Sequence, residues 1–169
     1  MTLHTSSPPS PASGRGIIPE GVHLVGSVPL ASEEEVFRAA TSELGDRLRR
    51  VPDGETGPRS DWIVWQYPVL SSRPEFEVAP PAPHSYRALP QLRLRAAEDG
   101  KELAFEQLGY AEAALSSYRT FAVLKRDGVL PRGCRFQVSL PTPLAPISAF
   151  VATAGQALVE GAYETAMLA

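Results

Sequence analysis

Short apolar runs alternate with longer amphipathic stretches along most of this 169-residue chain. Three apolar runs are short and bounded by Gly or Pro, which is typical of buried strands. They span residues 21–28, 48–52 and 135–140. Four stretches have apolar residues three and four positions apart, the spacing of one helix face. They span residues 33–44, 58–69, 102–126 and 156–168. This order of strands and helices predicts an α/β fold with parallel strands.

The first predicted helix has clear signals at both ends. Ser32 and Glu35 have the spacing of a capping box, in which each residue satisfies a free backbone amide of the first turn. Gly45 is placed to end the helix. Strand, helix and strand fit within about 35 residues here, which is the size of a βαβ unit.

Two regions are expected to differ from this pattern. Residues 1–16, which include His4, are rich in Ser and Pro, and we expect a disordered tail. Residues 71–98 are expected to form an insertion or lid in the domain 17–169, because five prolines forbid long regular elements. Within it, 91–98 fits a short strand or a helix equally well, and His84 is expected at the surface.

The predicted βα units are fewer than a closed barrel needs. A (β/α)8 TIM barrel typically takes about 250 residues. We therefore expect residues 17–169 to contain only the first three or so βα units of a repeating α/β fold. Because open edges of a parallel sheet must be covered, we expect the remaining barrel half or self-association to complete it.

Composition and charge exclude several classes of function. The chain has 16 basic and 19 acidic residues, a formal net charge of −3, without the clustered Lys and Arg expected of a nucleic-acid binder. It lacks an apolar run near the roughly 20 residues that span a bilayer, and its first residues lack signal-peptide features. We expect a cytoplasmic protein without nucleic-acid or membrane partners.

Candidate chemistry follows two of the predicted strands. Asp53 and Glu55 lie two residues apart, so both side chains leave one face, while Gly54 lets a ligand approach the backbone. Ser27 ends the first strand in the same way. Because α/β folds bind ligands at the carboxyl ends of parallel strands, we expect Ser27 and Glu55 to share one edge. An Asp-Gly turn with a solvated glutamate is the alternative.

Four other side chains have two interpretations each. Trp62 and Trp65 are three residues apart on one side of a helix, and they fit core packing or a ligand-binding wall. His23 shares a strand face with Ser27 and fits a hydrogen-bonded core position or a deeper site position. Cys134 precedes the third strand, away from the predicted site, and we expect structural packing rather than a reactive thiolate.

Three motifs resemble one enzyme family. Leu24-Val25-Gly26-Ser27-Val28-Pro29 is similar to the Ile-Gly-Ser-Phe-Pro strand end of the cobalamin-independent methionine synthases. Asp53-Gly54-Glu55 and then Arg59-Ser60-Asp61-Trp62 resemble their His-Gly-Glu and Arg-Asn-Asp-Met segments, and 138–143 is a looser match to their Gly-Pro-Val-Thr. Residues 22–169 thus resemble the amino-terminal part of a single-barrel member of the methionine synthase and uroporphyrinogen decarboxylase superfamily.

The resemblance implies a TIM barrel that transfers a methyl group from a folate to a thiol such as homocysteine, held on zinc. By position, Ser27 would touch the polar end of the amino acid and Glu55 would receive its ammonium group. Asp53, Arg59 and Trp62 would complete the substrate site. Asp53 stands where the family has histidine, Trp62 replaces methionine, and one extra residue separates Glu55 from Arg59.

The family's zinc ligands, a His-x-Cys pair, a Glu and a second Cys, belong to the later half of the barrel. We therefore assign no catalytic or metal-binding residue here, expect zinc and methyl-folate only in a full-length homologue, and expect these 169 residues alone to be inactive. Two alternatives remain open. One is a uroporphyrinogen-decarboxylase-like enzyme in which Asp53 and Arg59 grip an acidic substrate, and the other is a non-catalytic binding or assembly half-barrel.

Overall fold

The structure, a computed structural model, describes residues 21–81, 83, 86–95 and 103–169. The predicted tail, His4 and His84 lie outside these residues. In chain order the helices and strands are α1 (Glu33–Leu44), β1 (Arg50–Pro52), α2 (Gln66–Ser71), β2 (Phe76–Ala79), β3 (Gln91–Leu94), α3 (Tyr110–Arg126), β4 (Arg135–Gln137), α4 (Leu144–Phe150) and α5 (Gln156–Leu168). Short 3-10 helices are η1 (Gly45–Arg47), η2 (Gly57–Arg59), η3 (Tyr86–Ala88) and η5 (Thr153–Gly155).

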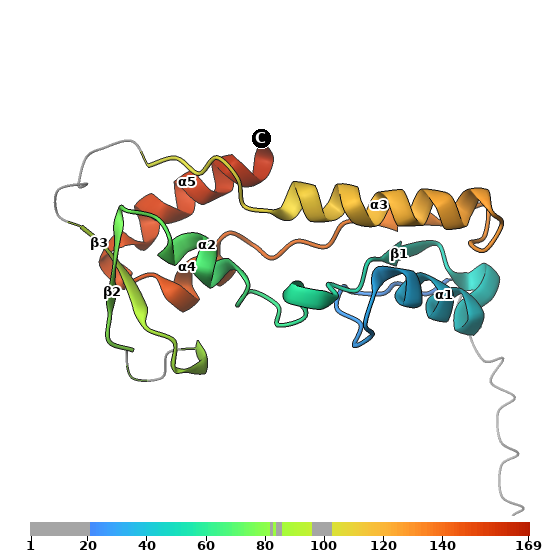
Figure 1. Cartoon of the computed structure of the whole chain (residues 1–169), viewed down its shortest axis with the longest axis horizontal. Helices are drawn as coiled ribbons and strands as arrows, with labels where there is room; N and C mark the ends of the chain where they lie inside the picture. Colours follow the sequence, from blue (N-terminus) through green and yellow to red (C-terminus); the bar gives the residue numbers. More distant parts are fainter. Residues whose placement is uncertain (1–20, 82, 84–85, 96–102) are drawn as a thin grey trace, which may run out of the picture.

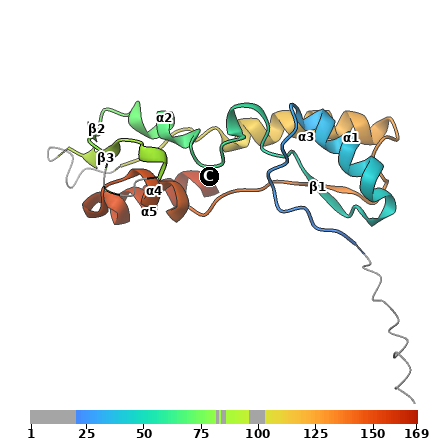
Figure 2. The ribbon, with the colours of Figure 1, turned by 90° about the horizontal axis from the view of Figure 1, so that it is seen from below.

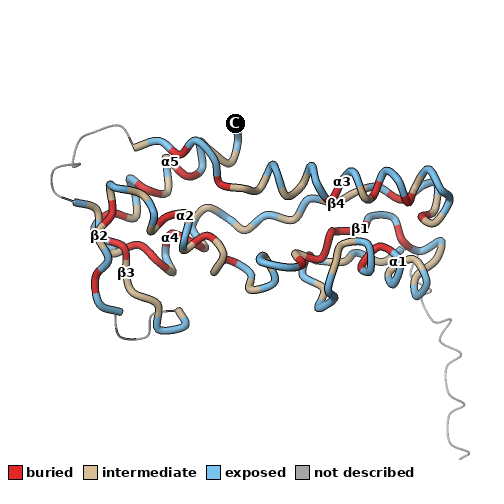
Figure 3. Tube along the Cα trace, in the orientation of Figure 1, coloured by how far each residue is buried: buried red, intermediate tan, exposed pale blue. Residues whose placement is uncertain are grey.

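The elements form two groups at the two ends of an elongated molecule (Figures 1 and 2). One group contains α1, β1, α3 and β4, and the other contains α2, β2, β3, α4 and α5. Each group has its own cluster of buried apolar side chains, and Figure 3 shows buried residues gathered in both. Among the described residues this is a mixed α/β structure with two two-stranded sheets, which confirms the α/β class.

Three parallel segments form the centre of the first group. β1 pairs with β4 in parallel, with Val51 opposite Phe136. Residues 22–28, which we call the first segment, run beside β1 on its other side. Val22 forms a parallel bridge with Leu48, and Val28 N donates to Gly54 O at 2.9 Å. The predicted parallel order of the three segments is therefore present.

The first segment is not the regular strand that its sequence predicts. Only Val22 makes a bridge there. The carbonyl oxygens of Leu24 and Val25 accept instead from the side-chain amide of Gln137, at 2.8 and 3.2 Å. Because a side chain replaces the backbone donors of a ladder at these positions, the segment stays extended without becoming a strand.

Helices α1 and α3 pack against β1 and β4. α1 begins where predicted, and Ser32 Oγ accepts from Glu35 N at 3.2 Å. Glu35 Oε2 accepts from Ala31 N at 3.1 Å, one residue before the Ser32 amide that a capping box would use. Gly45 follows the helix with φ of 51°. The aromatic rings of Phe37 and Phe121 meet edge to face with centroids 5.8 Å apart. The buried members of this core are Phe37, Leu48, Val51, Phe121, Leu124, Leu130 and Cys134.

The Pro-rich stretch 71–98, expected as an insertion or lid, contains two short strands where the structure describes it, and residues 91–94 take the strand alternative. β2 and β3 pair antiparallel, with Phe76 opposite Leu94. Phe76 and Leu92 are buried in the second core, against α4 and α5. The prolines flank these strands rather than interrupt them, since Pro74 and Pro80 lie on either side of β2 and Pro90 precedes β3.

The helix predicted over 58–69 is also wrong. Trp62 has φ of 46°, a left-handed conformation that cannot continue a helix. The stretch divides into η2, a series of turns and α2. α3 starts at Tyr110 rather than at residue 102, after Gly109 with φ of 82°. None of the described helices has both the length and the apolar character needed to cross a bilayer.

Candidate functional site

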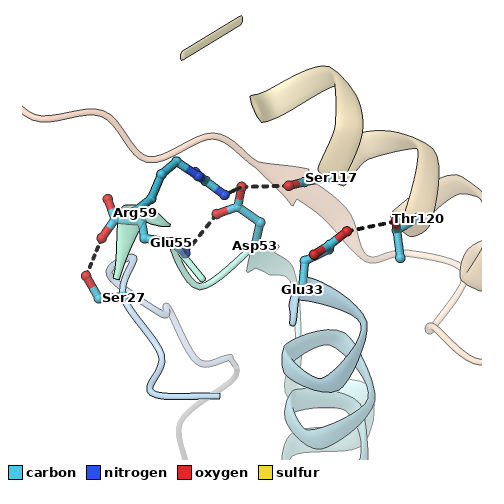
Figure 4. A network of polar contacts seen from close by, with 7 residues as sticks. All are labelled: Ser27, Glu33, Asp53, Glu55, Arg59, Ser117 and Thr120. Atoms are coloured by element: carbon cyan, nitrogen blue, oxygen red, sulfur yellow. Dashed lines mark hydrogen bonds and ion pairs between the residues drawn. The ribbon is translucent and has the colours of Figure 1, made fainter. Parts of the chain in front are cut away.

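The carboxyl ends of the three parallel segments meet at one edge. Ser27 lies near the end of the first segment, Glu55 follows β1 and Ser139 follows β4. We call these three residues the rim. Ser27 Oγ donates a hydrogen bond to Glu55 Oε2 (Figure 4). A Cβ at Gly26 would lie 3.3 Å from Ser139 Cβ and 3.7 Å from Glu55 Oε2. The sequence correctly predicts that Ser27 and Glu55 share an edge.

Asp53 lies beneath the rim, and its carboxylate oxygens accept hydrogen bonds from other groups of the protein. It is only 5% exposed. Its Oδ2 accepts from Arg59 Nη2 at 2.7 Å and from Ser117 Oγ at 2.9 Å, and its Oδ1 accepts from Glu55 N at 3.1 Å (Figure 4). A buried carboxylate needs such partners. Asp53 and Arg59 therefore fix the loop that carries Glu55, and they bind each other.

The backbone of this loop holds Glu55 in an unusual conformation. Gly54 has φ of 80° and Glu55 has φ of 50°, both left-handed. A residue with a Cβ pays about 1 kcal/mol or more in this region. The hydrogen bond from Glu55 N to Asp53 holds the conformation in place. As a result the Glu55 carboxylate points toward Ser27 at the rim (Figure 4).

Glu55 has no cationic partner among the described residues, although it is partly buried. Its negative charge acts on Tyr110, a residue that sequence reasoning missed. Burial is the main cause that raises the pKa of Tyr110 to about 12; the hydrogen bond with Tyr163 lowers it, and Glu55 raises it. No sequence signal links Tyr110 to Glu55, because the two are far apart in the chain and only the fold brings them near each other.

Aromatic side chains continue inward from Tyr110. The ring of Trp65 meets that of Tyr110 edge to face, with centroids 4.8 Å apart. The Tyr110 and Tyr163 hydroxyls are 3.0 Å apart, and Tyr163 Oη donates to Gln66 Oε1 at 2.7 Å. Tyr163 and Gln66 are fully buried. Trp65 therefore packs against a network of hydrogen-bonded internal side chains. Trp62, which is predicted on the same helix face, does not.

Trp62 and His23 lie away from the rim. Trp62 is 47% exposed, and among the described residues its aromatic ring contact is with Tyr86, with centroids 6.3 Å apart. His23 is exposed, so the core interpretation of this residue is wrong. Of the five predicted site residues, the structure thus brings together Ser27, Asp53, Glu55 and Arg59, but not Trp62.

The described residues do not fit a zinc site. They contain no group of three or more His, Cys, Asp or Glu side chains placed to hold a metal ion. Cys134 is fully buried, as expected for a packing residue, and burial raises the pKa of its thiol more than Lys125 lowers it. A thiol in this state is a poor zinc ligand, since zinc binds the thiolate.

The site therefore consists of a rim with an unneutralised carboxylate, supported from below by a buried ion pair. Its interpretation depends on this geometry alone. Comparisons of the chain with protein families, with curated proteins and with solved structures found no match in any of the three.

Proposed function

We propose that the rim binds a small molecule of the amino-acid type through its ammonium group, as part of a methionine-synthase-like barrel protein. One observation carries this proposal. Glu55 presents a carboxylate at the carboxyl ends of adjacent parallel segments, with the Ser27 hydroxyl as its side-chain hydrogen-bond partner and without a cation among the described residues.

An ammonium group fits the chemistry of the rim. An ionised carboxylate has about four lone-pair sites, and the Ser27 hydrogen bond uses one of them. Ser139 Oγ donates to Val25 O at 3.1 Å and accepts from Gln137 Nε2 at 3.1 Å, which leaves one lone pair of Ser139 Oγ as an acceptor. An ammonium has three donors and would also neutralise Glu55, and hydrogen bonds to charged groups are worth about 1.5–3 kcal/mol.

The arrangement of the segments supports the barrel. The first segment, α1 and β1 follow each other as strand-like segment, helix and strand with parallel pairing. In such folds ligands bind at the carboxyl ends of the strands, where the rim lies. The outer edges of the first segment and of β4 have no strand partner within the described ranges. These edges support association with a second copy or with the remaining half of a barrel.

Methyl transfer to a thiol is the chemistry of the family that the motifs resemble, with zinc as its Lewis acid and a folate as donor. Because the described residues do not fit zinc, none of them is assigned a role in the methyl transfer itself. Their part in the proposal is recognition of the amino group: Glu55 binds it, Ser27 orients Glu55, and Asp53 with Arg59 holds the loop.

One observation makes the decarboxylase-like alternative less favoured than the methionine-synthase-like proposal. It needs Arg59 to grip an acidic substrate, whereas Arg59 Nη2 already binds the buried Asp53 at 2.7 Å. The half-barrel alternative, a binding module without chemistry, uses the same rim and differs only in that no reaction takes place after the ligand binds.

The experiment compares two thiols by isothermal titration calorimetry. L-homocysteine has the ammonium group and 4-mercaptobutanoate lacks it. We expect L-homocysteine to bind the wild type at least roughly tenfold more tightly, because only it pairs with Glu55. The variant Glu55→Gln should lose this preference. Glu77→Gln is the matched control, because Glu77 pairs with Arg93 in the other group of elements.

Equal affinity of the wild type for the two thiols would show that the rim does not recognise an ammonium group. Retention of the preference by Glu55→Gln would show that another residue provides it. Binding of uroporphyrinogen that is lost in Arg59→Gln, together with no binding of L-homocysteine, would instead favour the decarboxylase-like function.

A further inference from the structure

Two arginines stand side by side at the other end of the parallel segments. The register of the sheet places Arg50 of β1 directly opposite Arg135 of β4. Residues opposite each other in a ladder direct their side chains to the same face. Both arginines are exposed. The sequence alone does not predict this pair, because the two residues belong to different strands that are far apart along the chain.

This placement is unfavourable for the protein by itself. Adjacent strands are about 4.8 Å apart, and like charges directly opposite each other destabilise a sheet. Within the part of the chain that the structure describes, no carboxylate forms an ion pair with Arg50 or Arg135. A ligand with two negative charges would convert this repulsion into attraction.

A pocket opens beside Arg50. Its volume is about 320 Å³, and it is lined by Gly21, Val22, His23, Arg49 and Arg50. A Cβ at Gly21 would lie 3.1 Å from Arg49 Cγ, so the absence of a side chain lets the Arg49 stem lie against the backbone. His23 adds an exposed imidazole, which can donate a hydrogen bond. The pocket has the size of a small-molecule site and basic residues around it.

We propose that this pocket, together with Arg135 opposite Arg50 in the sheet, binds the phosphate group of a phosphorylated small molecule. A guanidinium has donors in a planar fork that matches two phosphate oxygens, so Arg50 and Arg135 can each bind phosphate in a bidentate manner. A phosphate monoester carries close to two negative charges at neutral pH, which balances the two arginines. The site lies at the amino ends of the segments, opposite the rim, and is independent of the function proposed there.

The test is thermal unfolding with inorganic phosphate or with sodium chloride at the same ionic strength. We expect phosphate to raise the Tm of the wild type by about 3 °C at ten times its Kd. Arg50→Gln and Arg135→Gln should each lose most of this rise. Arg38→Gln is the matched control, because Arg38 pairs with Glu34 on α1, and its rise should equal that of the wild type.

A second readout separates loss of binding from loss of folding. Removing either arginine relieves the repulsion between them, so Arg50→Gln and Arg135→Gln should melt at a higher temperature than the wild type without phosphate. A lower Tm in both variants would contradict the proposed repulsion and overturn the proposal. The same phosphate-induced rise in Arg135→Gln and in the wild type would also overturn it.

Titration calorimetry identifies the source of the phosphate group. We expect glycerol 3-phosphate to bind and glycerol not to bind, with affinity at least roughly tenfold weaker in Arg50→Gln. Binding to phosphatidylserine vesicles or to a single-stranded RNA, without binding of glycerol 3-phosphate, would show a macromolecular polyanion as the partner. That result would overturn the small-molecule site.

Discussion

Ser117 of α3 donates a hydrogen bond from its Oγ to Oδ2 of Asp53, at 2.9 Å and across 64 positions of sequence. This contact ties α3 directly to the loop that carries Glu55 (Figure 4). A second contact joins α3 to α1, where Thr120 Oγ1 donates to Glu33 Oε1 at 3.1 Å. The site loop is thus held by the helix packing of the first group, as well as by its own strand.

Replacing Asp53 should therefore destabilise the whole first group. Asp53→Asn removes the charge that pairs with Arg59 and leaves the guanidinium partly buried, with 18% of its side chain exposed. Breaking a buried ion pair in this way costs about 3 kcal/mol of unfolding free energy. Urea unfolding followed by circular dichroism measures the loss. Glu34→Gln, which breaks an exposed pair with Arg38, should cost less than about 1 kcal/mol of unfolding free energy. Equal losses in the two variants would contradict a stabilising role for the buried pair of Asp53 and Arg59.

Replacement by alanine should cost different amounts of unfolding free energy at two glycines of the same loop. Gly54 and Gly57 have φ of 80° and 63°, so alanine is strained at both. At Gly54 the new Cβ would also lie 2.6 Å from Val36 Cγ2, whereas at Gly57 nothing lies within 4 Å. We expect Gly57→Ala to cost about 1 kcal/mol and Gly54→Ala at least about 2 kcal/mol more. Equal midpoints in urea would show that the loop moves away from α1 without cost.

Much of the first group can be predicted from local sequence signals. Ser32 and Glu35 mark the start of α1, and apolar runs with bounding Gly and Pro locate β1 and β4, although both strands are shorter than the predicted 48–52 and 135–140. The shared edge of Ser27 and Glu55 follows from one rule about parallel strands. These predictions depend on residues close in sequence and on a general topology, which is why they agree with the structure.

The second group cannot be predicted in the same way. Its prolines suggest breaks in regular structure, yet in β2 and β3 they mark the ends of strands whose buried residues, such as Phe76 and Leu92, find partners on α4 and α5. α4 begins after Pro143 and contains Pro146 in its first turn, where no amide donor is needed. The role of Tyr110 beside Glu55 depends on tertiary contacts that no local pattern contains.

The buried thiol predicts slow chemical labelling. Cys134 is fully buried and burial raises its pKa, so the thiolate is scarce and the reagent has no access. We expect reaction with a disulfide reagent only as the protein unfolds, with rates that rise with urea concentration. Ser60→Cys places a thiol at an exposed position of the same chain and should react at once. Rapid labelling of the wild type in native buffer would contradict the burial of Cys134.

The raised pKa of Tyr110 predicts that the free energy of unfolding falls at high pH. Its pKa in the folded state is about 12, against 10.0 as the ordinary value, so its contribution is complete below pH 10 and is lost as the pH rises toward 12. Tyr110→Phe lacks this titration but also lacks the hydrogen bond to Tyr163. At about pH 8 it should be less stable than the wild type by about 1 kcal/mol, and at about pH 11 the gap should narrow. Urea unfolding at both pH values measures the gap, and a gap that stays constant or widens would place the Tyr110 hydroxyl in water rather than against Tyr163.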